Sequence, residues 1–122
     1  MATGHTMSEY IIYHNPRCSK SRNTLALLEE HGITPRVVLY LEAPPDAAQI
    51  RELLGKLGIG AAELVRRGEA QYKESGLGRE SSEEDIIAAM ARHPKLIERP
   101  IVVKGRRAVL GRPPENVLEL ID

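Results

Sequence analysis

The sequence predicts an α/β fold in which a mixed sheet is flanked by helices and interrupted by a helical insertion. An apolar segment at 10–13, a helical segment after Cys18 and a second apolar segment at 36–41 form a strand–helix–strand unit, which normally takes a right-handed crossover. A β-hairpin pattern follows around 105–107. Between these parts, the chain from about 46 to 93 has helical patterning.

A short polar loop separates the first predicted strand from the first predicted helix. The strand is rich in β-forming residues and ends before Asn15-Pro16, a pair that breaks regular structure. The helix begins just after Cys18 and stops at His31-Gly32, because glycine favours a helix end. Its apolar residues are Leu25, Leu27 and Leu28.

The second predicted strand and the start of the insertion follow that helix. The strand at 36–41 is mostly apolar, so we expect it to be buried on both faces. Asp46 is a candidate N-cap for a helix that ends at Gly58. Apolar residues recur in that helix at the helical spacing, at Ile50, Leu53, Leu54 and Leu57.

The rest of the chain predicts two more helical pieces, a hairpin and a final helix. The helical pieces at 61–67 and 82–93 are joined by a polar segment, 69–80, that predicts a loop or a short helix. Strands at 100–104 and 108–110 flank the predicted hairpin loop. The apolar side of the final helix is predicted to be Val117, Leu118 and Ile121. This order of elements is that of a thioredoxin-like fold with a helical insertion.

Length and composition favour one domain, predicted at 8–122, since 122 residues can bury their own core. We interpret residues 1–7 as an expression remnant, an alternative start before Met7 or a disordered terminus. The balance of 17 basic and 17 acidic residues gives no electrostatic case for nucleic acid or an anionic membrane. No apolar run reaches the roughly 18 residues of a membrane span, and a single cysteine fits the reducing cytoplasm.

Cys18, the only cysteine, is predicted at the N-terminus of the first helix. The unpaired N–H groups and the dipole there stabilise an anion, and Arg17, Lys20 and Arg22 add positive charge. Both effects favour the thiolate, which is the nucleophilic form of cysteine, and both would hold an oxyanion beside the sulfur. The local sequence also leaves open that Cys18 is a small buried apolar residue.

The sequence predicts no bound cofactor. The four histidines are scattered, and none pairs with Cys18 at a metal-ligand spacing. No glycine-rich dinucleotide loop follows a strand. Since the chain has no second thiol, any redox cycle must take its resolving thiol, and its electrons, from another molecule.

Four motifs occur along the chain in a characteristic order: HNPRCSKSRNTL at 14–25, YLEAPP at 40–45, HPKLIERPIVV at 93–103 and GRPPE at 111–115. Together they resemble the glutaredoxin-linked arsenate reductase family, and the resemblance covers essentially residues 8–122. The cysteine loop resembles that of an arsenate-reductase-like branch with Cys-Ser-Lys-Ser. The resemblance implies a thioredoxin-like fold with a helical insertion.

The resemblance also implies a thiol mechanism. Cys18 would attack arsenate, or a similar oxyanion, to give a thiol–arsenate adduct. Glutathione, as co-substrate, would displace the adduct, and glutaredoxin would resolve the mixed disulfide with release of arsenite.

The resemblance assigns further residues to the site. Three arginines, Arg66, Arg99 and Arg112, would hold the oxyanion, as guanidinium groups do bidentately, although Arg67 lies beside the first of them. His14 would favour the thiolate of the reactive cysteine. The bond from Arg99 to the following proline resembles the cis-proline that thioredoxin-like folds place beside the thiol. The residues predicted to shape the binding loop are Asn15, Ser21 and Arg22.

The chain departs from the best-characterised reductases of the family at Ser19-Lys20, where those have Gly-Thr. This leaves a glutathione-linked oxidoreductase of another substrate as an alternative. A sister group binds RNA polymerase and typically carries Cys-x-x-Cys, whereas here the second position is Ser21. This argues against a disulfide switch but leaves a thioredoxin-like regulator that binds RNA polymerase as a further alternative. A Cys-x5-Arg phosphatase is disfavoured because Arg22 follows the cysteine by four positions instead of six.

Overall fold

A computed structural model describes residues 9–121 of the chain. These residues form two compact units. The first unit comprises the described residues up to Tyr40 together with those from Arg99 onward, and the second is Leu41–Glu98. The insertion predicted at 46–93 falls within the second unit. The prediction for residues 1–7 lies outside the described residues, and a single domain at 8–122 stays a prediction.

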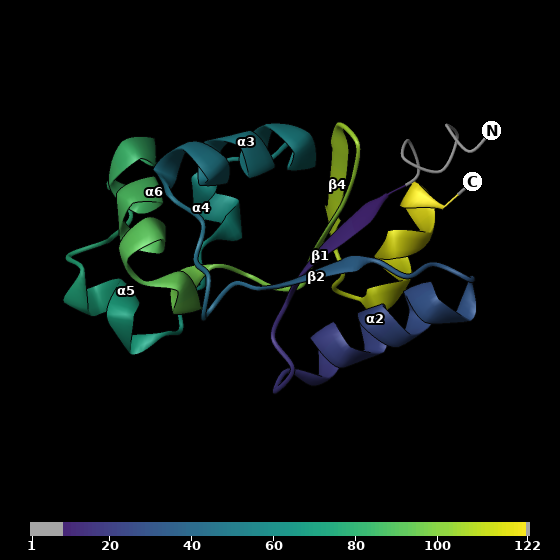
Figure 1. Cartoon of the computed structure of the whole chain (residues 1–122). Coiled ribbons are helices and arrows are strands. Elements are labelled where there is room, and N and C mark those ends of the chain that lie inside the picture. The colour runs from purple at the N-terminus through teal and green to yellow at the C-terminus, as the bar shows by residue number, and fades with distance from the viewer. Residues whose placement is uncertain (1–8, 122) are drawn as a thin grey trace. The chain divides into compact units, whose positions relative to one another are not determined.

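The first unit contains a mixed sheet with the strand order β2-β1-β3-β4 (Figure 1). The central strand β1 (Tyr10–His14) pairs in parallel with β2 (Arg36–Leu39). It also pairs antiparallel with β3 (Ile101–Lys104), which in turn pairs antiparallel with β4 (Arg107–Leu110). The mixed sheet predicted from the sequence is therefore present.

The hairpin between β3 and β4 is tighter than predicted. Lys104 pairs with Arg107, so the loop is the two residues Gly105-Arg106 and Arg107 belongs to the strand. Gly105 has a φ of 64°, whereas no residue other than glycine has a positive φ in the described chain. A glycine at the first of two central positions is typical of a type II′ turn, which matches the twist of the strands.

The prediction that the second strand is buried on both faces is wrong. β2 is an edge strand, paired only with β1, and it ends at Leu39 instead of residue 41. Arg36 and Val37 are exposed, and 43% of Val37 is accessible to solvent. An apolar run indicates a strand, but the position of that strand in the sheet decides how much of it is buried.

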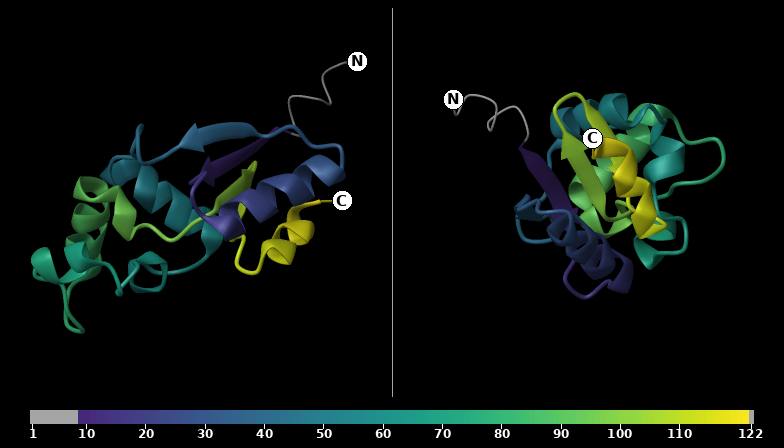
Figure 2. Two further views of the ribbon diagram at one scale, coloured as in Figure 1. Left: turned by 90° about the horizontal axis from the view of Figure 1, so that it is seen from below. Right: turned by 90° about the vertical axis from the view of Figure 1, so that its right-hand side faces the viewer.

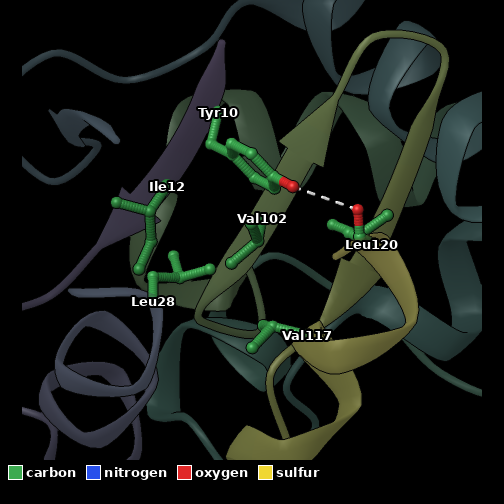
Figure 3. Packing of buried hydrophobic residues seen from close by; sticks show 6 residues of the cluster. All are labelled: Tyr10, Ile12, Leu28, Val102, Val117 and Leu120. Atoms are coloured by element: carbon green, nitrogen blue, oxygen red, sulfur yellow. Dashed lines mark hydrogen bonds between the residues drawn. The ribbon is translucent and has the colours of Figure 1, made fainter. Parts of the chain in front are cut away.

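One face of the sheet is covered by α2 (Ser19–Glu30) and the 3₁₀ helix η2 (Pro114–Leu120), which lie side by side (Figure 2). Side chains from β1, β3, α2 and η2 meet in the core drawn in Figure 3. The hydroxyl of Tyr10 donates a hydrogen bond of 3.1 Å to the carbonyl of Leu120, which joins the sheet to the last helix. The buried residues of this core are Tyr10, Ile12, Leu28, Val102, Val117 and Leu120.

The final helix uses a different apolar face from the one predicted. Val117 and Leu120 are buried, whereas Leu118 is 41% exposed and Ile121 is only partly buried. The reason is the type of helix. Side chains three residues apart eclipse one another in a 3₁₀ helix, so Val117 and Leu120 share one face.

The second unit consists mainly of helices, which are α3 (Ala47–Leu57), α4 (Ala61–Leu64), α5 (Ala70–Glu74), α6 (Glu83–Arg92) and the 3₁₀ helix η1 (Pro94–Leu96). Asp46 caps α3 in a capping box with Gln49, and Gly58 ends it with a φ of 72°. The helix predicted at 61–67 stops earlier, because Val65 is extended and forms a β-bridge with Ile97. None of the helices within residues 9–121 is both long and apolar enough to cross a membrane.

Candidate active site

The loop between β1 and α2 is a tight turn held by its own polar groups. The N–H of Cys18 donates to the carbonyl of Asn15 at 3.0 Å, which closes a β-turn with Pro16 at its second position, a position that favours proline. The side-chain oxygen of Asn15 accepts from the N–H of Arg17, also at 3.0 Å. Asn15 therefore holds the turn through both its backbone and its amide.

Cys18 is the N-cap residue of α2. Its carbonyl accepts the first helical hydrogen bond, from the N–H of Arg22 at 3.0 Å, and its side chain makes no capping bond. The thiol is free and partly exposed. Because a helix leaves its first N–H groups without helical partners, the amides of the exposed residues Ser19 and Lys20 remain available at the same end as the sulfur. A small oxyanion could be held there.

The end of β1, the start of β3 and the end of β4 lie together at the end of the sheet next to this loop. Tyr13, near the end of β1, pairs with Ile101 at the start of β3, and Ile101 pairs with Leu110 at the end of β4. The residues just outside these strands are therefore brought together. They include Arg99, before β3, and Arg112, after β4.

Arg112 is the predicted oxyanion ligand that the structure places beside the thiol. Its Nη1 lies 4.0 Å from the Sγ of Cys18, although the two residues are 94 positions apart in sequence. The same nitrogen donates to the carbonyl of Arg99 at 3.1 Å, which holds the guanidinium in place. The peptide bonds Arg99–Pro100 and Arg112–Pro113 are both cis. The cis-proline expected after Arg99 is thus present.

A close contact between Gly111 and Thr24 was not predicted from the sequence. A Cβ added to Gly111 would lie 2.6 Å from the hydroxyl oxygen of Thr24 and 2.9 Å from the Cγ of Pro100. Thr24 is fully buried, and its hydroxyl proton is shared between the carbonyls of Lys20, at 2.8 Å, and Gly111, at 3.3 Å. This contact holds the first turn of α2 against the segment that carries Arg112. The only sequence signal was the glycine directly before that arginine.

His14 and Ser21 are buried together behind the loop. The Nδ1 of His14 lies 2.6 Å from the hydroxyl oxygen of Ser21. That oxygen accepts a hydrogen bond from the N–H of Asn15 at 3.0 Å. Ser21 is fully buried and His14 is 6% exposed. If the hydroxyl proton points to Nδ1, the imidazole is neutral with its proton on Nε2. Ser21 therefore holds the loop through the N–H of Asn15, and its hydroxyl is not at the surface.

The environment of His14 favours its neutral form. Burial, and then the positive charge of Arg22, lower the pKa of His14 from its ordinary value of 6.5. A neutral imidazole contributes no positive charge to a nearby thiolate. Positive electrostatics at the site therefore come from the arginine side chains, with Arg112 beside the sulfur, and from the helix N-terminus.

The basic residues of the loop itself are exposed. Arg17, Lys20 and Arg22 are all accessible to solvent. Nη1 of Arg22 donates to the carbonyl of Pro16 at 2.9 Å, so this side chain folds back over the turn. Arg22 thus shapes the loop, while the other two leave their charges in solvent around it.

Arg66, the third predicted oxyanion ligand, lies in the second unit. Its Nη1 is 2.7 Å from a carboxylate oxygen of Glu69, and its Nε is 3.3 Å from one of Glu98. The neighbouring Arg67 is exposed and makes only a long contact, 3.4 Å, with the carbonyl of Ala62. Arg66 is therefore already engaged by two carboxylates within its own unit. Across residues 9–121, no group of three or more His, Cys, Asp or Glu side chains could hold a metal ion.

Comparison with known proteins places this sequence in the ArsC family. The model of the ArsC family matches residues 13–120. The Escherichia coli (strain K12) protein YfgD is 60% identical over 112 residues, which cover 90% of this chain and 94% of YfgD. An arsenate reductase of Neisseria meningitidis serogroup A is 47% identical over 113 residues, which cover 91% of this chain and 97% of that protein.

A solved structure has the same fold. The structure of an arsenate reductase from Vibrio cholerae superimposes with a TM-score of 0.90 at 50% sequence identity, and the match covers 93% of this chain and 98% of that one. The arsenate reductases of this type are thioredoxin-like. The thioredoxin-like fold expected from the order of elements is therefore confirmed.

Proposed function

The chain belongs to the ArsC family, and from that premise we propose that it is an oxidoreductase that reduces arsenate to arsenite with Cys18 as the nucleophile. Glutathione is the proposed co-substrate and glutaredoxin the proposed redox partner. Relatives that match over nearly their whole length carry the name arsenate reductase, which supports the choice of substrate.

One observation carries the proposal. The partly exposed thiol of Cys18 lies at the N-terminus of α2, 4.0 Å from the guanidinium of Arg112. Amide N–H groups and a guanidinium around one sulfur are suited to an oxyanion that must be held while the sulfur attacks its central atom. A structural cysteine packed in an apolar core would have neither neighbour.

The remaining residues take proposed roles around that centre. Arg99 and Arg112 flank the same sheet edge and hold arsenate oxygens together. Asn15, Ser21 and Arg22 keep the loop in the shape that exposes the amides. Because its lowered pKa favours the neutral imidazole, we assign His14 to this supporting group through its contact with Ser21. Arg66 is the proposed third arginine, and its ion pairs with Glu69 and Glu98 would have to loosen for it to bind an anion.

The proposed chemistry has three steps. The thiolate of Cys18 forms a sulfur–arsenic bond as one oxygen leaves as water, and arsenic remains As(V). The thiol of glutathione then attacks Sγ, a sulfur–sulfur bond forms, and the electron pair of the broken sulfur–arsenic bond stays on arsenic, which leaves as arsenite. Glutaredoxin finally reduces the mixed disulfide and returns Cys18 as a thiolate. This cycle needs a second thiol from outside, as a chain with one cysteine requires.

We place the reaction in the cytoplasm. The sulfur of Cys18 must be reduced at the start of each cycle, and the glutathione pool keeps cytoplasmic thiols reduced. The same pool supplies the thiol that the second step consumes.

The test is arsenate-dependent oxidation of NADPH, coupled through glutathione, glutaredoxin and glutathione reductase. We expect turnover by the wild type, none by Cys18→Ser, and a kcat/KM about 100-fold lower for Arg112→Ala, the usual effect of removing one donor to a developing oxyanion. Arg36→Ala is the matched control, because Arg36 is an exposed arginine on the edge strand of the same unit.

Two results would contradict the proposal. An Arg112→Ala variant as active as Arg36→Ala would remove Arg112 from the anion site. Absence of turnover in a wild-type protein whose Cys18 still reacts with iodoacetate would exclude arsenate and favour another glutathione-linked substrate.

A further inference from the structure

The second unit contains a small cavity that the arsenate proposal does not use. Its volume is about 180 Å³. One wall is the turn of residues 75–77 together with Ser81, and the other is a face of α6 that carries Asp85, Ala88 and Arg92. Pockets for drug-sized ligands are usually 300–1,000 Å³, so this cavity suits a smaller molecule.

The α6 wall presents opposite charges at its two ends. Asp85 and Arg92 are seven residues apart, which puts their backbones about 10 Å apart on the same face of the helix. Ala88 and Ala89 lie between them, and their small side chains leave the space open. Neither Asp85 nor Arg92 has an ion-pair partner among residues 9–121, in contrast to Glu84 on the same helix, which pairs with Arg51.

The opposite wall presents one hydroxyl group, that of Ser81. Ser75 also lines this wall, but its hydroxyl oxygen is buried. The hydroxyl oxygen of Ser81 accepts from the N–H of Gly78 at 2.9 Å, so its proton is available to donate. A ligand in the cavity would therefore meet a carboxylate, a guanidinium and one hydroxyl.

We propose that this cavity binds a small zwitterion, a free amino acid or a dipeptide. Its ammonium group pairs with Asp85, and its carboxylate pairs with Arg92, which binds such groups bidentately. A long side chain on a helix can reach back toward the N-terminus of that helix, and with Arg92 so placed the distance between the two charged groups matches one or two residues.

The binding test uses the full-length chain labelled with ¹⁵N and titrated with glycylglycine. Amide signals of Ser75, Ser81 and Ala88 report the cavity, and we expect them to shift and saturate. Two blocked peptides, N-acetylglycylglycine and glycylglycinamide, each lack one of the ligand's charges. We expect each to bind at least about tenfold more weakly, the effect of losing one charge-assisted hydrogen bond.

Variants separate binding from helix stability. Asp85→Asn and Arg92→Gln should each weaken binding of glycylglycine by about tenfold or more. The controls are Glu84→Gln and Lys95→Gln, which remove a charge near each end of α6 without touching this cavity, and they should bind as the wild type does. Absence of saturable shifts, equal affinity for all three peptides, or equal weakening by the controls would overturn the proposal. The readout is independent of arsenate turnover, since Cys18 takes no part in it.

Discussion

His14 is a buried histidine whose surroundings favour the neutral imidazole. Its pKa is lowered by burial and then by Arg22. In the unfolded chain the group titrates near 6.5, so the unfolded state binds more protons than the folded state as the pH falls below that value. The stability that His14 contributes is therefore fully present above about pH 6.5 and is lost as the pH falls toward the lowered pKa of the folded state.

This linkage predicts a pH dependence that belongs to one residue. Between about pH 7 and pH 5, the free energy of unfolding of the wild type should fall more steeply than that of His14→Gln, by at most about 1.4 kcal/mol per pH unit for one proton. Urea unfolding at several pH values measures both slopes. Parallel curves for the wild type and His14→Gln would refute the linkage.

Gly111 is required for space and not for backbone conformation, since its φ is not positive. Gly111→Ala should lower the free energy of unfolding by about 1–3 kcal/mol, the usual cost of overpacking, because the added Cβ would meet the hydroxyl of Thr24 at 2.6 Å. Activity should fall further than stability explains, since the segment that carries Arg112 must shift.

A double-mutant cycle tests that explanation. Thr24→Ala removes both Thr24 atoms that crowd the added Cβ. The loss of unfolding free energy in the double variant Gly111→Ala, Thr24→Ala should therefore be smaller than the sum of the losses in the two single variants. Contacting residues typically couple by 0.5–3 kcal/mol. Additive effects, measured by urea unfolding, would show that the contact does not limit position 111.

The three longest helices begin in two different ways. Asp46 caps α3 and Ser82 caps α6, each by accepting an N–H bond in its side chain. Cys18, at the same position of α2, makes no such bond. The helix that carries the thiol therefore lacks the stabilisation of a side-chain cap, and its first amides remain available to a ligand.

Capping α2 should accordingly stabilise the protein and inactivate it. Cys18→Asp should be more stable than Cys18→Ala by about 1 kcal/mol, the usual worth of an N-cap carboxylate, and both variants should lack arsenate reductase activity. Asp46→Ala is the reference, because it removes the existing N-cap carboxylate of α3. It should lower the free energy of unfolding by a similar amount. Equal stability of Cys18→Asp and Cys18→Ala in urea unfolding would mean that the amides of α2 are not available.

At the scale of the whole chain, the first unit is assembled from the two ends of the sequence, with the second unit inserted between β2 and β3. The site follows from this arrangement. Cys18 comes from the loop after β1, and Arg112 comes from the segment after β4. They meet because β1, β3 and β4 are neighbours in the sheet, so that the end of β1, the start of β3 and the end of β4 lie together.

The sequence by itself determined the fold class, the order of most helices and strands, and the position of the thiol ahead of α2. These features depend on local periodicity, caps and turn residues, which a linear pattern contains. The motifs also pointed to Arg112 before any distance was known. His31-Gly32, Asp46 and Gly58 marked helix ends correctly for the same local reason.

Only the tertiary structure decided the features that depend on partners far away in sequence. The apolar β2 is exposed because it lies at the sheet edge, and Leu118 is exposed because η2 is a 3₁₀ helix packed through Val117 and Leu120. The neutral state of His14 depends on its burial and on Arg22, and the role of Gly111 depends on Thr24 across the core. Burial, charge state and steric fit are properties of neighbours in space, and the fold alone chooses those neighbours.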